Sequence, residues 1–113
     1  MDYEVEVKRH FKKRSLPQNR LYWLYLSCIM DETGNDRDTL HNEFREMFLP
    51  VRIGSLGGKE TKNLTSTTTL NTKQFKDYID RIVVWAAAEE GIALPDPEDK
   101  YFAMFYEQYR DFV

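Results

Sequence analysis

The stretch NTKQFKDYIDRIVVWAAAEEG, residues 71–91, is the clearest structural signal in the chain. Its apolar residues follow the spacing of one helix face, at Phe75, Tyr78, Ile79, Ile82, Val83 and Ala86. Asn71 or Thr72 can cap the start of this helix, and Gly91 can end it. The stretch therefore predicts an amphipathic helix that packs one face on a core.

Upstream, residues 17–33 predict a second helix that stops at Gly34. Ser15 is a candidate N-cap, with Gln18 three residues later as its capping-box partner. Residues 21–26 are apolar nearly all round, whereas a surface helix shows a single apolar stripe. We therefore expect this helix to pack on the core and also on a second subunit.

Two more helices are predicted on either side of the central region. One is capped by Asp36 or Asp38 and ends before Pro50, with apolar positions at Leu40, Phe44, Met47 and Phe48. The other begins at Asp96-Pro97, a cap followed by a first-turn proline, and carries aromatic residues toward residue 113.

The remaining segments suggest β-structure. Tyr3, Val5 and Val7 alternate with charged residues, which predicts a short N-terminal strand. Residues 50–70 form a long connection that can hold a β-hairpin turning at Gly57-Gly58. The whole pattern predicts a single domain over residues 1–113, an α-rich α+β fold with about four helices.

Composition narrows the class of protein. The 113 residues are 42% hydrophobic, enough for one core, and hold no run of about eighteen apolar residues that could span a bilayer. We expect a protein of the cytoplasm. Cys28 is the single cysteine, so it cannot form an internal disulfide, and its apolar surroundings predict a buried thiol.

The charges are unevenly distributed, although the formal net charge is only -3. Residues 7–30 hold six basic residues and no acid, and residues 47–76 hold five basic residues and one acid. The rest of the chain is acidic. Two separated basic segments can form one basic face that attracts phosphate, or they can be ordinary solvated charges.

One segment is more specific than a capped helix. Arg14-Ser15-Leu16-Pro17-Gln18-Asn19-Arg20-Leu21-Tyr22-Trp23 resembles the Arg-Ser-Leu-x-Gln-Asn-x-x-x-Trp entrance of the NinB family of phage recombination proteins, the lambda Orf type. Residues 66–75 are similar to the family's Ser/Thr-rich stretch before a helix, and residues 85–92 to the glycine-containing end of that helix. The matches come in the family's order and span residues 9–96.

This resemblance implies a homodimer that binds single-stranded DNA and helps a strand-annealing or single-strand-binding protein during phage recombination. It implies no enzymatic activity and no cofactor. It also implies a phage or prophage protein that works in the bacterial cytoplasm.

The residues themselves suggest the same ligand. A single-strand binder needs cations for the phosphates, and the start of a helix attracts phosphate oxygens. The candidate DNA-binding residues are Lys12, Lys13, Arg14, Gln18, Asn19, Arg20, Lys59, Lys62, Ser66, Thr67, Thr68 and Lys73. Gln18 and Asn19 can serve as helix caps instead, and residues 66–69 can form an edge strand. Tyr22, Trp23 and Tyr25 are more typical of a core or an interface than of base stacking.

Other function classes find less support. His10 and His41 lie in no zinc-binding pattern, and the acids fall on helix faces and caps, so a metal-dependent nuclease is the weaker hypothesis. No metal site or cofactor is predicted. A DNA-independent helical adaptor that docks a partner through its aromatic helices remains the main alternative.

Overall fold

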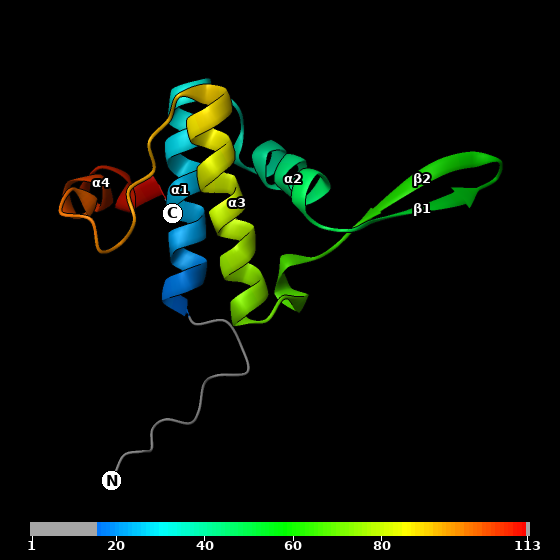
Figure 1. Cartoon of the computed structure of the whole chain (residues 1–113). Coiled ribbons are helices and arrows are strands. Elements are labelled where there is room, and N and C mark those ends of the chain that lie inside the picture. Colours follow the sequence, from blue (N-terminus) through cyan, green and yellow to red (C-terminus); the bar gives the residue numbers. More distant parts are fainter. Residues whose placement is uncertain (1–15, 113) are drawn as a thin grey trace, which may run out of the picture.

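A computed structural model describes residues 16–112, and the strand expected at residues 3–7 lies outside them. The elements are α1 (Leu16–Thr33), α2 (Arg37–Phe48), β1 (Val51–Leu56), β2 (Lys59–Leu64), η1 (Thr67–Thr69), α3 (Thr72–Glu90), α4 (Phe102–Tyr109) and η2 (Arg110–Phe112). Four α-helices and a two-stranded antiparallel hairpin between α2 and α3 confirm the α-rich α+β prediction (Figure 1).

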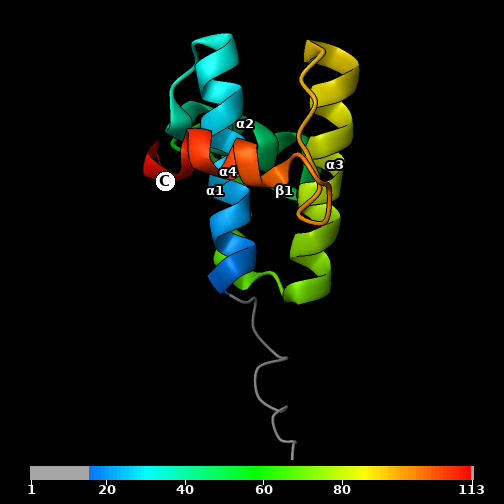
Figure 2. The same cartoon turned by 90° about the vertical axis from the view of Figure 1, so that its left-hand side faces the viewer.

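Helices α1 and α3 lie side by side and point the same way, so that their N-termini are at the same end of the molecule (Figures 1 and 2). Between and around them lies one core, which includes the fully buried Phe44 of α2 and Phe75 of α3. Helix α4 crosses the pair on the side away from the hairpin (Figure 2).

The apolar belt of α1 is covered by three different elements of the same chain. The Tyr22 ring lies 5.4 Å from that of Phe75 in α3, Trp23 lies 5.0 Å from His41 in α2, and Tyr25 lies 5.8 Å from Phe105 in α4. These contacts confirm that the α1 aromatic residues belong to a core. A second subunit is not required to bury them.

The predicted caps of two helices are confirmed. Asp36 accepts a hydrogen bond from the Thr39 backbone N–H at the start of α2. Asn71 and Gln74 form a reciprocal capping box at the start of α3, and Gly91 ends α3 with a φ of 66°. Because these caps provide partners for some of the N–H and C=O groups that a helix leaves unbonded at its ends, the bounds of α3 match the expected ones closely.

One expectation was wrong in local detail, and one of the alternatives left open by the sequence is excluded. The fourth helix begins at Phe102 and not at Asp96, because the Asp96 and Asp99 carboxylates accept hydrogen bonds from the Glu98 and Tyr101 backbone N–H groups and hold residues 96–101 in turns. Residues 67–69 form a 3-10 helix and not an edge strand, since the Ser66 hydroxyl caps it by accepting from the Thr68 N–H.

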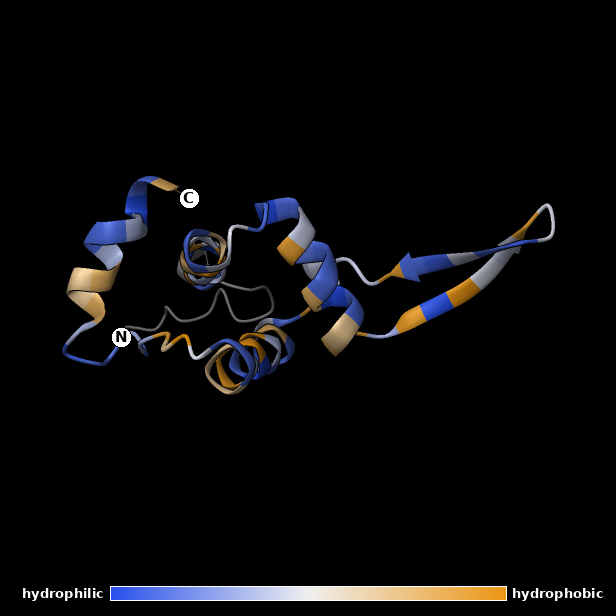
Figure 3. Ribbon diagram, turned by 90° about the horizontal axis from the view of Figure 1, so that it is seen from above, coloured by the Kyte–Doolittle hydropathy of each residue, from blue (hydrophilic) through white to orange (hydrophobic). Residues whose placement is uncertain are grey.

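The hairpin extends away from the helices (Figures 1 and 3). It joins β1 to β2 through Gly57 and Gly58, whose φ angles of 59° and 81° are both positive, as the predicted tight turn requires. The Cα radius of gyration is 16.5 Å, against about 13 Å for a compact domain of this size. Within the described part of the chain, none of the helices has the length and apolar character to cross a bilayer.

Candidate nucleic-acid interface

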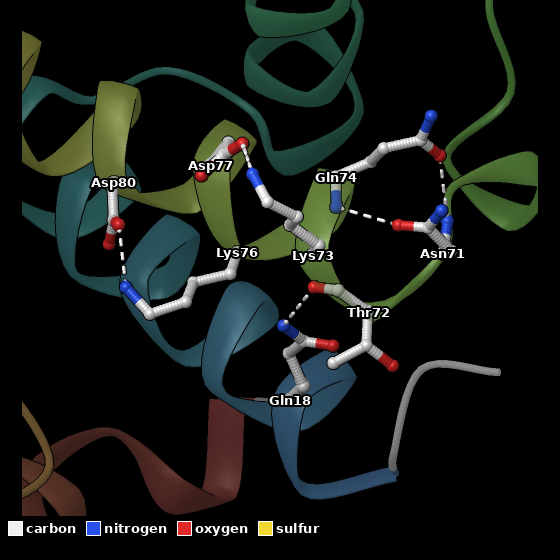
Figure 4. Close-up of polar contacts among 8 residues, drawn as sticks. All are labelled: Gln18, Asn71, Thr72, Lys73, Gln74, Lys76, Asp77 and Asp80. Atoms are coloured by element: carbon white, nitrogen blue, oxygen red, sulfur yellow. Dashed lines mark hydrogen bonds and ion pairs between the residues drawn. The ribbon is translucent and has the colours of Figure 1, made fainter. Parts of the chain in front are cut away.

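The N-termini of α1 and α3 are joined by a hydrogen bond. The Gln18 side-chain amide donates to the Thr72 backbone carbonyl over 3.1 Å, as Figure 4 shows. Gln18 therefore links the two helices, while its expected capping partner Ser15 lies outside the described residues. Two helix starts that are far apart in the sequence are thus placed next to each other.

This end of the molecule is favourable for an anion. Neither α1 nor α3 has an acidic residue in its first turn, so no carboxylate in these turns competes with an anion for the positive ends of the helix dipoles. Arg20 of α1 and Lys73 and Lys76 of α3 are exposed at the same end. We call Gln18, Arg20, Thr72, Lys73 and Lys76 the helix-entrance cluster.

Both lysines of the cluster have acidic neighbours on α3. Lys73 lies 3.5 Å from Asp77 and Lys76 lies 2.8 Å from Asp80, each one helical turn away (Figure 4). Lys76 donates a hydrogen bond to Asp80, and this bond together with the charge of the carboxylate raises the pKa of Lys76, so this ammonium keeps its proton. Because both pairs are exposed to water, they are weak, and a phosphate can replace the carboxylate.

The cluster contains only part of the predicted site. Gln18, Arg20 and Lys73 are brought together, and Asn19 is half-buried beside them on α1. Lys12, Lys13 and Arg14 lie outside the described residues. Ser66 and Thr68 are exposed at η1, whereas Thr67 is buried.

The two remaining predicted cations lie on the hairpin. Lys59 is exposed beside the turn, and Lys62 forms an ion pair with Glu46 of α2. The hydrogen bond and charge of Glu46 raise the pKa of Lys62. The hairpin leaves the helical body on the side of α2, whereas the helix-entrance cluster lies at the N-terminal ends of α1 and α3 (Figure 1). One continuous basic path does not follow from this geometry.

A groove of about 560 Å³ lies between α1, α3 and residues 96–106, and every cluster residue except Lys73 lines it. Arg20 and Lys76 line it together with apolar side chains, among them Leu24, Ile79 and Phe102. Asp80, Asp96 and Glu98 also line it. Because these acids repel phosphate, the groove itself is a poor path for a nucleic acid, and its apolar walls are better suited to a side chain of a protein or to a small apolar ligand.

The buried polar groups serve the core. The Tyr22 hydroxyl lies 2.5 Å from His41 Nδ1 and 3.1 Å from the Tyr78 hydroxyl. Burial lowers the pKa of His41 and raises that of Tyr78 to about 12, so both groups are neutral at physiological pH. Burial also raises the pKa of the Cys28 thiol, as expected for an unreactive cysteine.

The sequence prediction of the site left out two cations that lie near the candidate surfaces, Lys76 and Arg52. Lys76 follows Lys73 at i+3, a spacing that places both on one side of a helix. Arg52 is exposed on β1, and strand alternation could have paired its face with that of Lys59. Both signals were present in the sequence.

The chain matches no protein-family model, no curated protein sequence and no solved structure. The resemblance to the NinB family therefore rests on the quoted motifs alone. Among residues 16–112, no three His, Cys, Asp or Glu side chains gather in a way that could hold a metal ion.

Proposed function

We propose that this protein binds single-stranded DNA through the helix-entrance cluster. The observation that carries the proposal is the meeting of two helix N-termini, joined by Gln18 and Thr72, with exposed cations on both helices. Such a site offers dipoles and charges to successive phosphates. It is supported from the sequence side by the basic residues 8–14, which lead directly into α1.

The biological role that fits this activity is that of an accessory protein in phage-type homologous recombination. This part of the proposal rests on the NinB-like motifs, and with it go a homodimer, a strand-annealing or single-strand-binding partner and the bacterial cytoplasm. The protein would act by positioning DNA and would catalyse no reaction.

A binding titration with a labelled single strand, at two salt concentrations, tests the DNA-binding activity. Arg20→Ala combined with Lys73→Ala should weaken binding and lower the slope of log affinity against log salt by about 0.7 for each phosphate that the variant no longer binds. Lys100→Ala is the control, because Lys100 is exposed, lies over the Tyr101 ring and does not belong to the cluster. If the double variant binds like the control, the cluster is not the DNA site.

The groove between α1, α3 and residues 96–106 favours a second candidate, a protein-docking adaptor. Its apolar walls would take a partner side chain, and such an interface responds little to salt. A wild-type protein that binds no single strand at low salt would favour this candidate over DNA binding.

A further inference from the structure

The hairpin, residues 51–64, is a second exposed surface with its own chemistry, and we call it the β-arm. It extends from the helical body, and its base is fixed by hydrogen bonds around Thr65, which donates to the Pro50 carbonyl and whose own carbonyl accepts from Arg45. The tip is a two-residue glycine turn without side chains. A narrow arm on a fixed base can enter a groove of a partner.

One face of the β-arm is defined by the strand register. Arg52, Gly54 and Leu56 of β1 lie opposite Asn63, Thr61 and Lys59 of β2, and side chains at opposite positions share a face. A Cβ at Gly54 would lie only 2.9 Å from Thr61 Oγ1 and 3.3 Å from Asn63 Nδ2, so these two side chains lie across the glycine. The face thus holds a cation at each end and polar groups between them.

The charges on the two faces differ. The face just described holds Arg52 and Lys59 and no acid, and within residues 16–112 neither cation forms an ion pair. The opposite face holds Glu60 together with Lys62, whose charge is paired with Glu46 of α2. The first face is therefore free to meet an anionic partner, on a protein whose formal net charge is -3.

The side chains of the β-arm favour duplex over single-stranded DNA. Unpaired bases are held mainly by stacking on aromatic rings, and residues 51–64 include no aromatic residue. A two-stranded ribbon fits the major groove of a duplex, which is about 12 Å wide. Lys59 lies opposite Leu56, which is four residues from Arg52 on β1. The two cations are therefore spaced by roughly 13 Å along the arm, a distance close to the width of the groove.

We propose that the β-arm enters the major groove of duplex DNA, with Arg52 and Lys59 on phosphates and Leu56 on base methyl groups. Leu56 is 76% exposed at the tip, an arrangement that an apolar contact in the groove explains. The proposal rests on the proposed single-strand binding and extends it. The substrate is then a junction, whose single strand contacts the helix-entrance cluster and whose duplex holds the β-arm.

Three labelled probes test this proposal with the full chain: a single strand, a blunt duplex and a duplex with a single-stranded tail. Wild-type protein should bind the tailed duplex most tightly. Each lost phosphate contact lowers the salt slope by about 0.9, so Arg52→Ala combined with Lys59→Ala should lower the slope on the blunt duplex by about two. The same variant should weaken single-strand binding much less than duplex binding. Leu56→Ser should weaken duplex binding without changing the slope, because an apolar contact releases no counterion.

Arg81→Ala combined with Lys100→Ala is the matched control, since it also removes two exposed cations but lies outside the β-arm. Melting temperatures of all variants confirm folding. The proposal is overturned if the arm variant binds the blunt duplex like the control, if it loses single-strand binding equally, or if its main effect is a changed oligomeric state. If wild-type protein does not bind the single-stranded probe, the proposed single-strand binding is wrong, and this result is distinct from the effect of the arm variant.

Discussion

Tyr22 is a buried residue whose hydroxyl joins three parts of the core. It is 1% exposed and is hydrogen-bonded to His41 of α2 and Tyr78 of α3. Tyr22→Phe keeps the ring but removes the hydroxyl to which His41 and Tyr78 are hydrogen-bonded. We therefore expect the free energy of unfolding to fall by about 2 kcal/mol. Urea denaturation should show a lower midpoint with an unchanged slope. Tyr101→Phe, at a 59% exposed position, serves as the control and should leave the midpoint unchanged.

His41 makes stability depend on pH. Its pKa lies below the ordinary value of 6.5, first because of burial and then because of the nearby Arg45 charge, while Asp38 acts in the opposite direction. The unfolded chain therefore takes up a proton at a higher pH than the folded protein does. Stability is complete above about pH 6.5 and falls as the pH drops toward the folded-state pKa.

An NMR titration of the His41 ring checks the direction of this shift. In parallel, His41→Gln should remove part of the loss of stability between neutral and mildly acidic pH. A ring that titrates above its ordinary value would contradict the assignment of burial as the main cause.

At the scale of elements, two substitutions at the start of α3 separate an effect on stability from an effect on DNA binding. Asn71→Ala removes the cap that accepts from the Gln74 N–H and should cost about 1 kcal/mol. Asn71→Asp keeps a capping oxygen and suits the helix dipole, but it adds a negative charge beside Lys73. We expect Asn71→Asp to retain the melting temperature and to weaken single-strand binding. Equal affinity for both variants would mean that DNA does not pass this helix start.

The elements that could be predicted were those with a strong local cause. The periodicity of residues 75–86 and the caps at Asn71 and Gly91 indicated α3, and the paired glycines indicated the hairpin turn. The start of α4 could not be predicted, because Asp96-Pro97 suits a helix cap and a turn equally well. The Asp96 and Asp99 hydrogen bonds that decide between them are seen only in the structure.

For the candidate site, the sequence indicated basic residues but not their arrangement. Gln18 and Thr72 are 54 residues apart, and only the parallel arrangement of α1 and α3 brings them together. The distance of Lys59 from this cluster likewise depends on the direction in which the hairpin leaves the body. No local pattern contains either relation, because both are set by core contacts between elements.

At the scale of the whole molecule, the two ends of α3 differ in charge. Lys73 and Lys76 lie near its first turn, and Glu89 and Glu90 end it. The helix has 19 residues, so its ends are roughly 28 Å apart at 1.5 Å per residue. Charges are screened over about 8 Å at physiological salt and about 30 Å at 0.01 M. The two glutamates should therefore repel DNA bound at the cluster only at low salt.

Glu89→Gln combined with Glu90→Gln tests this distance effect. Single-strand affinity should rise in about 0.01 M salt and match that of wild type in about 0.15 M salt. At the higher concentration charges are screened over about 8 Å, which is far shorter than the helix. Lys73→Ala, in contrast, should weaken binding at both concentrations, since it removes a contact. The melting temperature of the glutamate variant should not fall, because negative charge at a helix C-terminus is unfavourable. An affinity gain of equal size at both concentrations would mean that the strand runs beside Glu89 and Glu90, and the site would have to be moved along α3.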